Sequence, residues 1–494
     1  MTIDRRKFLN LGVAGTVAGV APRPVTAEMP GVPDQAAATP QAKADHTIRI
    51  ANGLVELAAD HIVSTKLYNG EFPPPLLRLR EGQPVVIDIR NDTDTPEQLH
   101  WHGQTVPVDV DGAAEEGTPY IPAHGMRRIS FTPGPAGLRF YHSHLVPGAD
   151  LANGQYSGQV GTVYIEPKRE AGRYDREVFL MLKEFQPTLS RGGDMASDFL
   201  AKAAAVKSLQ DAGESAMRAS MASGKPHGYE VGYDLFSING RMLGHGEPIR
   251  VKQGERVMFH IVNGSATEIR SLALPGHRFE VVALDGNPVP NPVEVPVLWL
   301  GTAERISAIV EMKSPGIWVL GDLADDDRGK GMGIVVEYSG RTGKPKWVKP
   351  AGYRWDYTIF GKQEPAAAPE EAFEMTFAKN NAALDGFNEW TINGNAFSMA
   401  RMDPILRLKQ GRRYRLRMRN ASDDVHPVHL HRHNFELTRI AGKATSSVRK
   451  DVVMLGGYQE VEVDFVADNP GKTLFHCHQQ LHMDFGFMAL FDYA

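Results

Sequence analysis

The chain almost lacks cysteine: Cys477 is the only one among 494 residues, and this excludes an internal disulfide. Positive charge is not in excess either: the sequence has 54 Lys and Arg against 59 Asp and Glu, a formal charge of −5. This charge gives no electrostatic reason to expect nucleic-acid binding. Past the N-terminal region no apolar run is long enough to span a bilayer, so we expect no stable membrane insertion. What remains is a long chain with room for several domains and a large core.

The N-terminus has the pattern of an export signal. Arg5 and Arg6 precede a weakly apolar, Gly-rich stretch from Leu11 to Val20, and Val25-Thr26-Ala27 is a small-residue cleavage pattern. This resembles a twin-arginine signal, with a chance arginine pair before a Sec-type signal as the alternative. We therefore predict a signal peptide over residues 1–27 and a periplasmic mature protein. In that oxidising compartment a single cysteine cannot form a stabilising disulfide within the chain, which favours a ligand role for Cys477.

Composition and an internal repeat predict an all-β chain. The sequence contains 49 Gly and 33 Pro, as suits many short strands joined by turns. Stretches that begin at Leu76, Ile249 and Leu406 each show an alternating strand, a Gly-led turn, a second alternating strand and then an Asn. Copies spaced by the length of a domain indicate duplicated domains, and the alternation suits β-sandwiches.

The repeat also predicts the domain boundaries. We expect a flexible N-terminal segment at 28–45, a first domain at 46–168, a second at 169–345, a linker at 346–369 and a third domain at 370–494. The segment at about 190–228 is rich in Ala, Ser and Met and breaks the strand pattern. We predict that it forms a helix and loop inserted in the second domain.

Two segments of the repeat carry a His-x-His pair in the outer copies and none in the middle copy. The pairs are His100/His102, His142/His144, His429/His431 and His476/His478. At the same positions the middle copy has Leu272, Leu274, Gly321 and Leu323. A spacing of two residues puts both imidazoles of a pair on one face of a strand. We therefore expect the histidines of the first and third domains to converge on one cluster between these domains.

Cys477 lies inside the last of these pairs and faces the other way. Because strand side chains alternate, His476 and His478 point to one face of their strand and Cys477 points to the opposite face. A thiolate with two imidazoles is the blue-copper ligand set. The sequence thus predicts a second, mononuclear centre, with His482 as one candidate ligand and another imidazole to come from elsewhere in the chain.

Together these residues resemble the three-domain multicopper oxidases, the laccase-like family, over essentially the whole mature chain. Four segments carry the resemblance: His100-Trp101-His102-Gly103, His142-Ser143-His144, His426-Pro427-Val428-His429-Leu430-His431 and His476-Cys477-His478-x3-His482. The resemblance implies three consecutive cupredoxin-like Greek-key β-sandwich domains and bound copper of three types. It implies that His426, Cys477 and His482 bind the type 1 copper. The type 2 copper would be bound by His100 and His429. The type 3 pair would be bound by His102, His142, His144, His431, His476 and His478.

The axial position and the proton donors follow the family less closely. Family members carry Met, Leu or Phe ten residues after the cysteine, and here Phe487 cannot coordinate, which predicts a three-coordinate type 1 site of fairly high potential.

Asp111 matches an acidic residue that the family uses near the cluster, with a capped turn before Gly112 as the alternative. Bacterial relatives often have Glu directly after the last histidine. This chain has Met483 there, followed by Asp484, which becomes the candidate for a second proton donor.

The resemblance implies an enzyme, a copper-dependent oxidoreductase with dioxygen as acceptor. It would couple the one-electron oxidation of four donor equivalents, phenols or aromatic amines, to the four-electron reduction of dioxygen to water. Electrons would enter at the type 1 site and pass through Cys477 to His476 and His478. The expected partners are dioxygen and small aromatic donors or Cu(I), and the expected state is a monomer.

Two other functions are alternatives. A cuprous or other metal-ion oxidase in periplasmic copper tolerance would use soft sulfur ligands, for which Met195, Met217 and Met221 are candidates beside a plain packing role. A copper-free structural protein on the same fold is disfavoured by the complete ligand set. Asp423 and Asp424, just before His426, could guide a cationic donor, although a solvated loop is the preferred interpretation.

Overall fold

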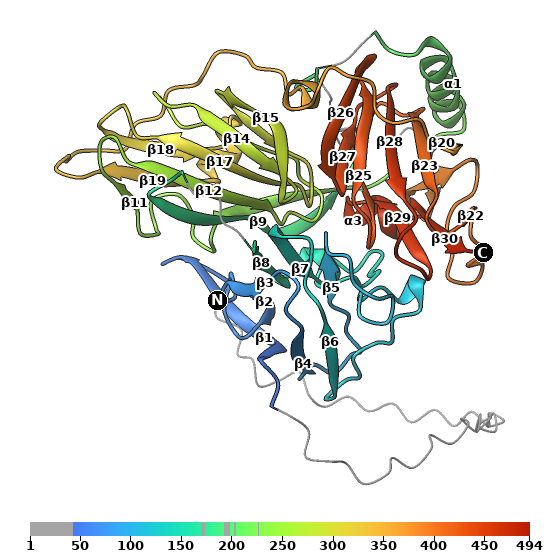
Figure 1. Cartoon of the computed structure of the whole chain (residues 1–494), viewed down its shortest axis with the longest axis horizontal. Helices are drawn as coiled ribbons and strands as arrows, with labels where there is room; N and C mark the ends of the chain where they lie inside the picture. Colours follow the sequence, from blue (N-terminus) through green and yellow to red (C-terminus); the bar gives the residue numbers. More distant parts are fainter. Residues whose placement is uncertain (1–42, 169–172, 192–197, 202–203, 226) are drawn as a thin grey trace, which may run out of the picture. The chain divides into compact units, whose positions relative to one another are not determined.

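The computed structural model describes residues 43–168, 173–191, 198–201, 204–225 and 227–494. The predicted signal peptide 1–27 and most of the predicted segment 28–45 lie outside these residues. The described chain is built largely of strands, arranged as three sandwiches that follow one another in sequence (Figure 1). The prediction of an all-β fold is confirmed.

The first sandwich pairs a sheet of order β2-β1-β4-β6 with a sheet of order β3-β8-β7-β5. Its strands are β1 (His46–Ala58), β2 (His61–Tyr68), β3 (Leu77–Arg80), β4 (Val85–Asn91), β5 (His100–His102), β6 (Met126–Phe131), β7 (Gly137–His142) and β8 (Val160–Glu166), with a 3-10 turn η1 (Ala114–Glu116) between β5 and β6 and η2 (Gly154–Tyr156) before β8. Ile87 and Ile89 of β4 alternate into a core that includes Trp101 and Val163. The short strand β5 lies at the edge of its sheet, beside β7.

The middle sandwich is built on a six-stranded sheet of order β10-β9-β12-β17-β14-β15, with smaller sheets β11-β19-β18 and β13-β16. The elements are β9 (Arg176–Ser190), α1 (Lys207–Ala222), β10 (Glu230–Ile238), β11 (Ile249–Val251), β12 (Arg256–Asn263), β13 (Arg270–Leu272), β14 (Phe279–Leu284), β15 (Asn287–Val295), β16 (Leu298–Leu300), β17 (Arg305–Glu311), β18 (Ile317–Gly321), α2 (Asp325–Gly329) and β19 (Gly333–Tyr338). A 3-10 turn η3 (Tyr357–Phe360) follows in the connection to the third sandwich.

The third sandwich pairs a sheet of order β21-β20-β23-β28-β25-β26 with one of order β22-β30-β29-β24-β27. Its elements are β20 (Glu371–Leu384), β21 (Phe387–Ile392), β22 (Leu406–Leu408), β23 (Arg413–Asn420), β24 (His426–Leu430), β25 (Phe435–Ile440), β26 (Lys443–Lys450), β27 (Val452–Leu455), β28 (Glu460–Val466), β29 (Thr473–Cys477), α3 (Gln480–Asp484) and β30 (Met488–Tyr493). The three sandwiches share a parallel pairing at corresponding places: β1 with β4, β9 with β12, and β20 with β23.

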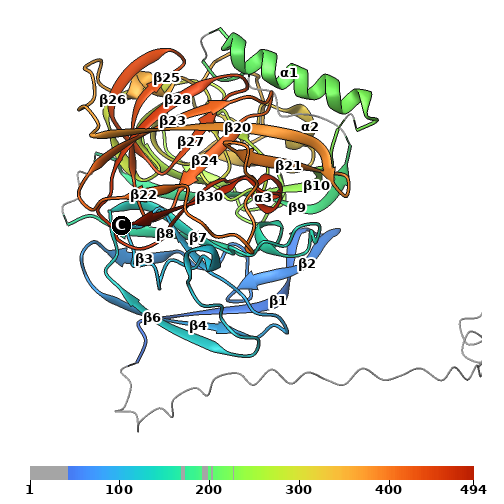
Figure 2. The same ribbon diagram turned by 90° about the vertical axis from the view of Figure 1, so that its right-hand side faces the viewer.

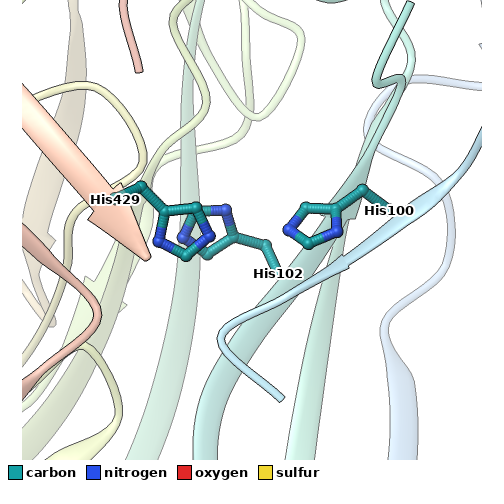
Figure 3. Close-up of side chains that lie close together, drawn as sticks. All are labelled: His100, His102 and His429. Carbon is teal, nitrogen blue, oxygen red and sulfur yellow. The ribbon is translucent and has the colours of Figure 1, made fainter. Parts of the chain in front are cut away.

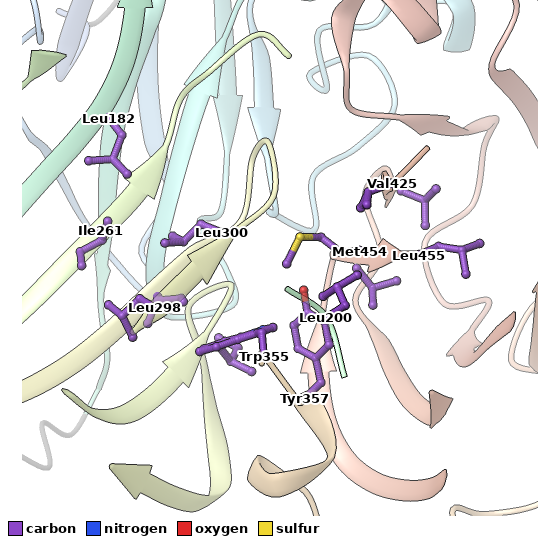
Figure 4. Packing of buried hydrophobic residues seen from close by; sticks show 14 of the residues in the cluster. Leu182, Leu200, Ile261, Leu298, Leu300, Trp355, Tyr357, Val425, Met454 and Leu455 are labelled. Atoms are coloured by element: carbon purple, nitrogen blue, oxygen red, sulfur yellow. The ribbon is translucent and has the colours of Figure 1, made fainter. Parts of the chain in front are cut away.

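Continuous apolar packing joins the sandwiches. The largest core cluster runs from Ile261 and Leu300 of the middle sandwich, past Trp355 and Tyr357, to Met454 of the third (Figure 4). A smaller cluster draws on all three sandwiches, with Leu138, Phe140 and Val160 from the first, Met181, Val262 and Ala303 from the middle and Val452 from the third. Because such interiors are packed like crystals, side chains from different sandwiches can meet in fixed geometry.

Helix α1 belongs to the segment predicted as a helical insert. It lies between β9 and β10 in sequence but packs along β20 of the third sandwich (Figure 2). The Val206 N–H donates to the Tyr458 carbonyl at 2.9 Å, and the Asn381 amide donates to Met217 Sδ at 3.0 Å. The insert therefore connects the middle sandwich to the third. Among the described residues, no helix has both the length and the apolar character needed to cross a membrane.

Candidate metal centre

Cys477, His426 and His482 form the first of two groups of candidate ligands. Strand β24 runs antiparallel to β29 with Val428 opposite Cys477, so His426 lies near the end of the strand that carries the cysteine. Helix α3 follows β29 directly and brings His482 next to Cys477 and His426. Cys477 Sγ is 3.7 Å from His426 Nδ1 and 3.6 Å from His482 Nδ1, and all three side chains are buried. These donor atoms are close enough to share one metal ion.

Aromatic rings enclose this group. The Phe487 ring centroid lies 4.9 Å from that of His426, and the Trp390 ring lies 4.8 Å from His426 and 4.2 Å from His482. Phe487 is fully buried and offers only carbon at its position. The next residue, Met488, has a thioether, but it packs in a separate cluster with Leu474 and Met483. The surroundings of the group are thus apolar.

Ser422 and Asp424 are polar exceptions near this group. The Ser422 hydroxyl donates to Asn420 Oδ1 at 2.8 Å and accepts from His426 Nε2 at 2.9 Å, which leaves Nδ1 of that ring free to bind metal. Asp424 is 2% exposed and binds the Lys379 ammonium at 2.7 Å. The interpretation of this stretch as a solvated loop is therefore wrong for Asp424, because a buried carboxylate is stabilised by a paired charge.

The second group is a histidine cluster between the first and third sandwiches. Its donor atoms fall into three sets, each within 4.8 Å: His100, His102 and His429; His102, His142 and His478; His144, His431 and His476. Rings from the two sandwiches stack on one another, with centroids 3.8 Å apart for His102 and His429 and 4.0 Å apart for His100 and His431. Figure 3 shows the first set, with His429 beside His102.

Equivalent strand pairings place these histidines. In the first sandwich β5 pairs with β7 so that His100 lies opposite His142. In the third sandwich β24 pairs with β29 so that His429 lies opposite His476. The two-residue spacing then puts the second histidine of each pair on the same face. Every ligand-type side chain of the cluster comes from the first or third sandwich within the part of the chain that the structure describes.

The buried nitrogens of the cluster fit a metal ion. Hydrogen-bond partners within the described chain are lacking for the buried atoms His100 Nε2, His144 Nδ1, His144 Nε2, His429 Nε2 and His478 Nδ1. Burial, with neighbouring imidazoles, lowers the pKa well below its usual value for His102, His142, His429, His431, His476 and His478, so these rings are neutral donors. Unpaired buried polar atoms are costly, and a bound cation would satisfy them. The imidazole and thiolate donor set suits copper.

Burial raises the pKa of the Cys477 thiol far above its usual value. In the apolar site a thiolate would be an uncompensated charge, and only a bound metal ion would stabilise it, because coordination deprotonates a thiol outright. Burial likewise lowers the pKa of His426 and His482 well below the usual value, so both rings are neutral donors. The chemistry of this group fits a soft cation.

Asp111 lies behind the cluster. Its backbone carbonyl accepts from His100 Nδ1 at 3.0 Å, and its Oδ2 accepts from His431 Nδ1 at 2.8 Å. The Gly112 N–H donates to the Thr118 hydroxyl instead, so the capped-turn alternative for Asp111 does not describe this turn. Asp111 therefore orients histidines from two sandwiches, one through its backbone carbonyl and one through its carboxylate.

Asp484 is half-buried and faces another region. Its Oδ1 accepts from the Gln480 amide at 2.6 Å and its Oδ2 accepts from the Gly148 N–H at 2.9 Å. Burial raises the pKa of this carboxyl well above its usual value. Asp484 thus joins α3 to a loop of the first sandwich.

Glu115, Glu116 and Asp451 lie beside the cluster and were missed by sequence reasoning. Glu115 Oε2 is 3.5 Å from His144 Nδ1, and Glu116 Oε1 is 3.5 Å from His431 Nδ1. Burial and nearby Asp111 raise the pKa of Glu116 well above its usual value. Asp451 accepts from His102 Nε2 at 3.0 Å. The proximity of Glu115 and Glu116 to Asp111 in sequence was the one available signal.

Neither His433, two residues after His431, nor the described candidate methionines join either group. His433 Nδ1 donates to the His431 carbonyl at 3.0 Å, and its Nε2 lies 2.8 Å from the Tyr493 hydroxyl. Met217 already accepts a hydrogen bond from Asn381, and Met221 is 59% exposed. Met195 lies outside the described residues.

Comparison with known proteins gives one family for all three sandwiches. Family models described as multicopper oxidase match residues 50–170, 207–337 and 366–494. The multicopper oxidase MmcO of Mycobacterium tuberculosis is 27% identical, over 99% of this chain and 96% of that protein. Laccase-4 of Thanatephorus cucumeris is 23% identical, over 83% of this chain and 82% of the laccase. The crystal structure of a multicopper oxidase from Pseudomonas thermotolerans has a TM-score of 0.66 at 24% identity, over 92% of this chain and 100% of that one.

Proposed function

The chain belongs to the multicopper oxidase family, and we propose that it is a laccase-like member that oxidises phenols or aromatic amines. It is a copper-dependent oxidoreductase that uses dioxygen as acceptor, built from three cupredoxin-like domains. The observation that carries the proposal is the complete set of buried imidazole and thiol donors in two adjoining groups. Four one-electron donor molecules would be oxidised for each dioxygen reduced to water.

We assign the donors to copper as follows. His426 Nδ1, Cys477 Sγ and His482 Nδ1 would hold the type 1 ion, and His100 and His429 the type 2 ion. The two sets that would hold the type 3 pair are His102, His142 and His478, and His144, His431 and His476. Bound copper supplies one-electron redox chemistry at the cysteine group and dioxygen reduction at the histidine cluster.

The chain itself links the two groups by a short path. Cys477 is joined by peptide bonds to His476 and His478, which belong to the histidine cluster. The His476 Nδ1–H also donates to the Cys477 carbonyl at 2.8 Å, and the His478 N–H donates to the Pro427 carbonyl at 2.6 Å. These bonds hold the connecting backbone rigid, which supports electron passage through Cys477 with little rearrangement.

The surroundings of the cysteine group support an organic donor. Trp390 and Phe487 pack against His426, and Trp390 also packs against His482, so the group is enclosed by apolar aromatic rings, which suit an aromatic donor better than a hydrated metal ion. Asp424 is engaged by Lys379 and is not free to attract a cationic donor. Cuprous ion remains the alternative donor, with Met221 on α1 as an exposed thioether.

Dioxygen reduction consumes protons, and we propose Asp111 as their main source at the cluster. Its Oδ2 contacts His431 Nδ1, and its Oδ1 has no hydrogen-bond partner in the described chain. Asp484 is proposed as a second donor. Asp111 is fully buried and Asp484 is half-buried, and burial raises the pKa of the Asp484 carboxyl well above its usual value, so Asp484 holds a proton that it would supply.

We also propose that the protein acts as a monomer in the periplasm after export by the twin-arginine route. The arginine pair Arg5-Arg6, the apolar stretch and the cleavage pattern ending at Ala27 support this proposal.

Steady-state kinetics of the copper-loaded mature chain test the function. A phenol, an aromatic amine and Cu(I) are compared while dioxygen uptake is recorded, and we expect four donor equivalents per dioxygen with the organic donors. Turnover of Cu(I) alone would replace the laccase-like proposal by the cuprous oxidase. Full copper loading without turnover of any donor would refute an oxidase.

A further inference from the structure

Asp451 connects histidines of two sandwiches. It follows the last residue of β26 and precedes β27, and it is fully buried. Its Oδ1 lies 3.0 Å from His102 Nε2 of the first sandwich, and its backbone carbonyl lies 2.7 Å from His429 Nδ1 of the third. Since both contacts are to acceptor oxygens, the proton of each ring must sit on the contacting nitrogen. His102 then offers Nδ1 to a metal, and His429 offers Nε2.

Arg305 holds the carboxylate of Asp451 in a bidentate ion pair. Arg305 opens β17 of the middle sandwich and is fully buried. Its Nη1 donates to Asp451 Oδ1 and its Nη2 donates to Asp451 Oδ2, both at 2.6 Å. A bidentate pair fixes the plane of the carboxylate as well as its distance from the guanidinium, which a lysine cannot do. The direction of the His102 hydrogen bond is therefore set from the middle sandwich.

The pair is itself anchored within the middle sandwich. Arg305 Nη1 also donates to the Ala303 carbonyl at 2.9 Å, and Arg305 N–H donates to Asp285 Oδ1 at 3.0 Å. Asp285 Oδ2 in turn accepts from the Val452 N–H at 3.1 Å and from the Lys450 ammonium at 2.9 Å. The chain around Asp451 is thus tied to the middle sandwich through side chain and backbone.

Gly103 is a second, independent sign that the local chain accommodates this pair. It follows His102 directly and has a φ of 76°. A Cβ at this position would lie 2.5 Å from Arg305 Nη2 and 2.7 Å from Asp451 Oδ2. The ion pair passes over the backbone beside a ligand histidine, in space that only glycine leaves open.

We propose that Arg305 is a positioning residue: through Asp451 it orients His102 and His429 toward the metal, so the middle domain controls a cluster to which it gives no ligand. This inference rests on the copper assignments proposed above. Partners behind metal-binding histidines set the tautomer and ring direction, and their loss weakens metal binding by about 10–100-fold. The middle domain is then more than a spacer between the two ligand-bearing domains.

The test titrates copper-free protein with copper and measures each class of site separately. The absorption band of the cysteine–copper bond reports the type 1 site, and the electron paramagnetic resonance spectrum reports the type 2 site. Arg305→Lys keeps the positive charge but cannot form the bidentate ion pair with the Asp451 carboxylate. We expect it to retain the type 1 band with wild-type affinity and to lose about 10–100-fold in affinity at the histidine cluster, with a changed type 2 spectrum.

Arg270→Lys is the matched control. Arg270 is also a fully buried arginine of the middle sandwich, bound to Asp327 at 2.5 Å, and it belongs to neither candidate group. Thermal unfolding of the two variants without copper measures how far each replacement destabilises the fold, which separates general destabilisation from cluster positioning. Arg270→Lys should keep both classes of copper site.

Gly103→Ala perturbs the pair without removing a charge. It should reproduce the Arg305→Lys pattern, because the added methyl displaces Arg305 and Asp451. Gly254→Ala controls for backbone strain. Gly254 has a similar φ of 83°, but a Cβ at this position would have no other atom within 4 Å. Gly254→Ala should leave the copper sites unchanged.

Two results would overturn the inference. One is Arg305→Lys binding copper at the histidine cluster with wild-type affinity and an unchanged type 2 spectrum. The other is equal loss of type 1 and cluster copper in both Arg305→Lys and Gly103→Ala, because a positioning role would spare the cysteine group. A wild-type protein that loads copper but oxidises no donor would instead refute the proposed function.

Discussion

Copper removal should make this protein sensitive to acid. Burial holds the pKa of eight ligand imidazoles well below the usual value of 6.5, namely those of His102, His142, His426, His429, His431, His476, His478 and His482. Between the folded-state pKa and 6.5 the unfolded chain binds a proton at each of these rings and the folded chain does not. The free energy of unfolding must therefore fall as the pH falls below about 6.5.

The expected slope is large. Each such imidazole contributes at most about 1.4 kcal/mol per pH unit. Glu116, Asp451 and Asp484 act in the opposite direction, because burial raises their pKa values and the folded chain binds their protons first. Burial also raises the pKa of Glu268, Glu304 and Asp322, which act in the same direction as these three carboxyls. The imidazoles still outnumber the six carboxyls, so a net loss of about 3 kcal/mol per pH unit remains, against a total stability of about 5–15 kcal/mol. Copper-free protein at the lower end of this range should unfold within about two pH units below 6.5.

Urea unfolding of copper-free and copper-loaded protein at about pH 7.5, 6.5 and 5.5 measures this slope. Copper binds the folded state and should raise its stability at every pH, by about 4 kcal/mol at a thousandfold excess over the dissociation constant. His429→Gln removes one buried imidazole and should reduce the slope by about 1.4 kcal/mol per pH unit. A copper-free protein whose stability does not change between these pH values would refute the reasoning.

Four further predictions concern single residues. Phe487→Met should lower the potential of the type 1 site in a redox titration, because a thioether can bind where a phenyl ring cannot, and an unchanged or higher potential would contradict a three-coordinate site. Cys477→Ser should abolish the blue band while the histidine cluster still binds copper, and a protein that stayed blue would disprove the type 1 assignment. Asp111→Asn should lower kcat by about 100-fold or more while the reduction of the type 1 site by donor in stopped flow stays fast, as expected for loss of a proton donor. Trp355→Ala should lower the free energy of unfolding by about 3–5 kcal/mol in urea, because this 1% exposed ring fills the core between the middle and third sandwiches, and a loss below about 1 kcal/mol would contradict that packing.

The histidine pattern could be predicted because it depends on local geometry. A spacing of two residues puts side chains on one face of a strand, whatever the rest of the chain does. Comparing the repeats then singled out the outer copies, and the structure brings His100 opposite His142 and His429 opposite His476 in equivalent pairings. The same alternation separated Cys477 from its histidine neighbours.

The residues behind the ligands could not be predicted in this way. Asp451 and His102 are 349 positions apart, and Asp111 and His431 are 320 positions apart. Nothing in the spacing of Ser422 distinguishes a hydroxyl beside a ligand from one in water, and only its closeness to Asp111 in sequence marks Glu116. Asp424 looked like part of a solvated loop because its partner, Lys379, comes from a different strand.

The sequence by itself determined the donor types, the three-fold repeat, the two outer copies that carry the histidines and the side of the strand that Cys477 faces. These follow from the residues and from the period of a strand. Only the tertiary structure decided which nitrogen of His102, His426 and His429 is left for a metal, and which charges are compensated. Those properties depend on partners such as Arg305 and Asp451, which different domains bring into one dry interior where an unpaired charge is costly.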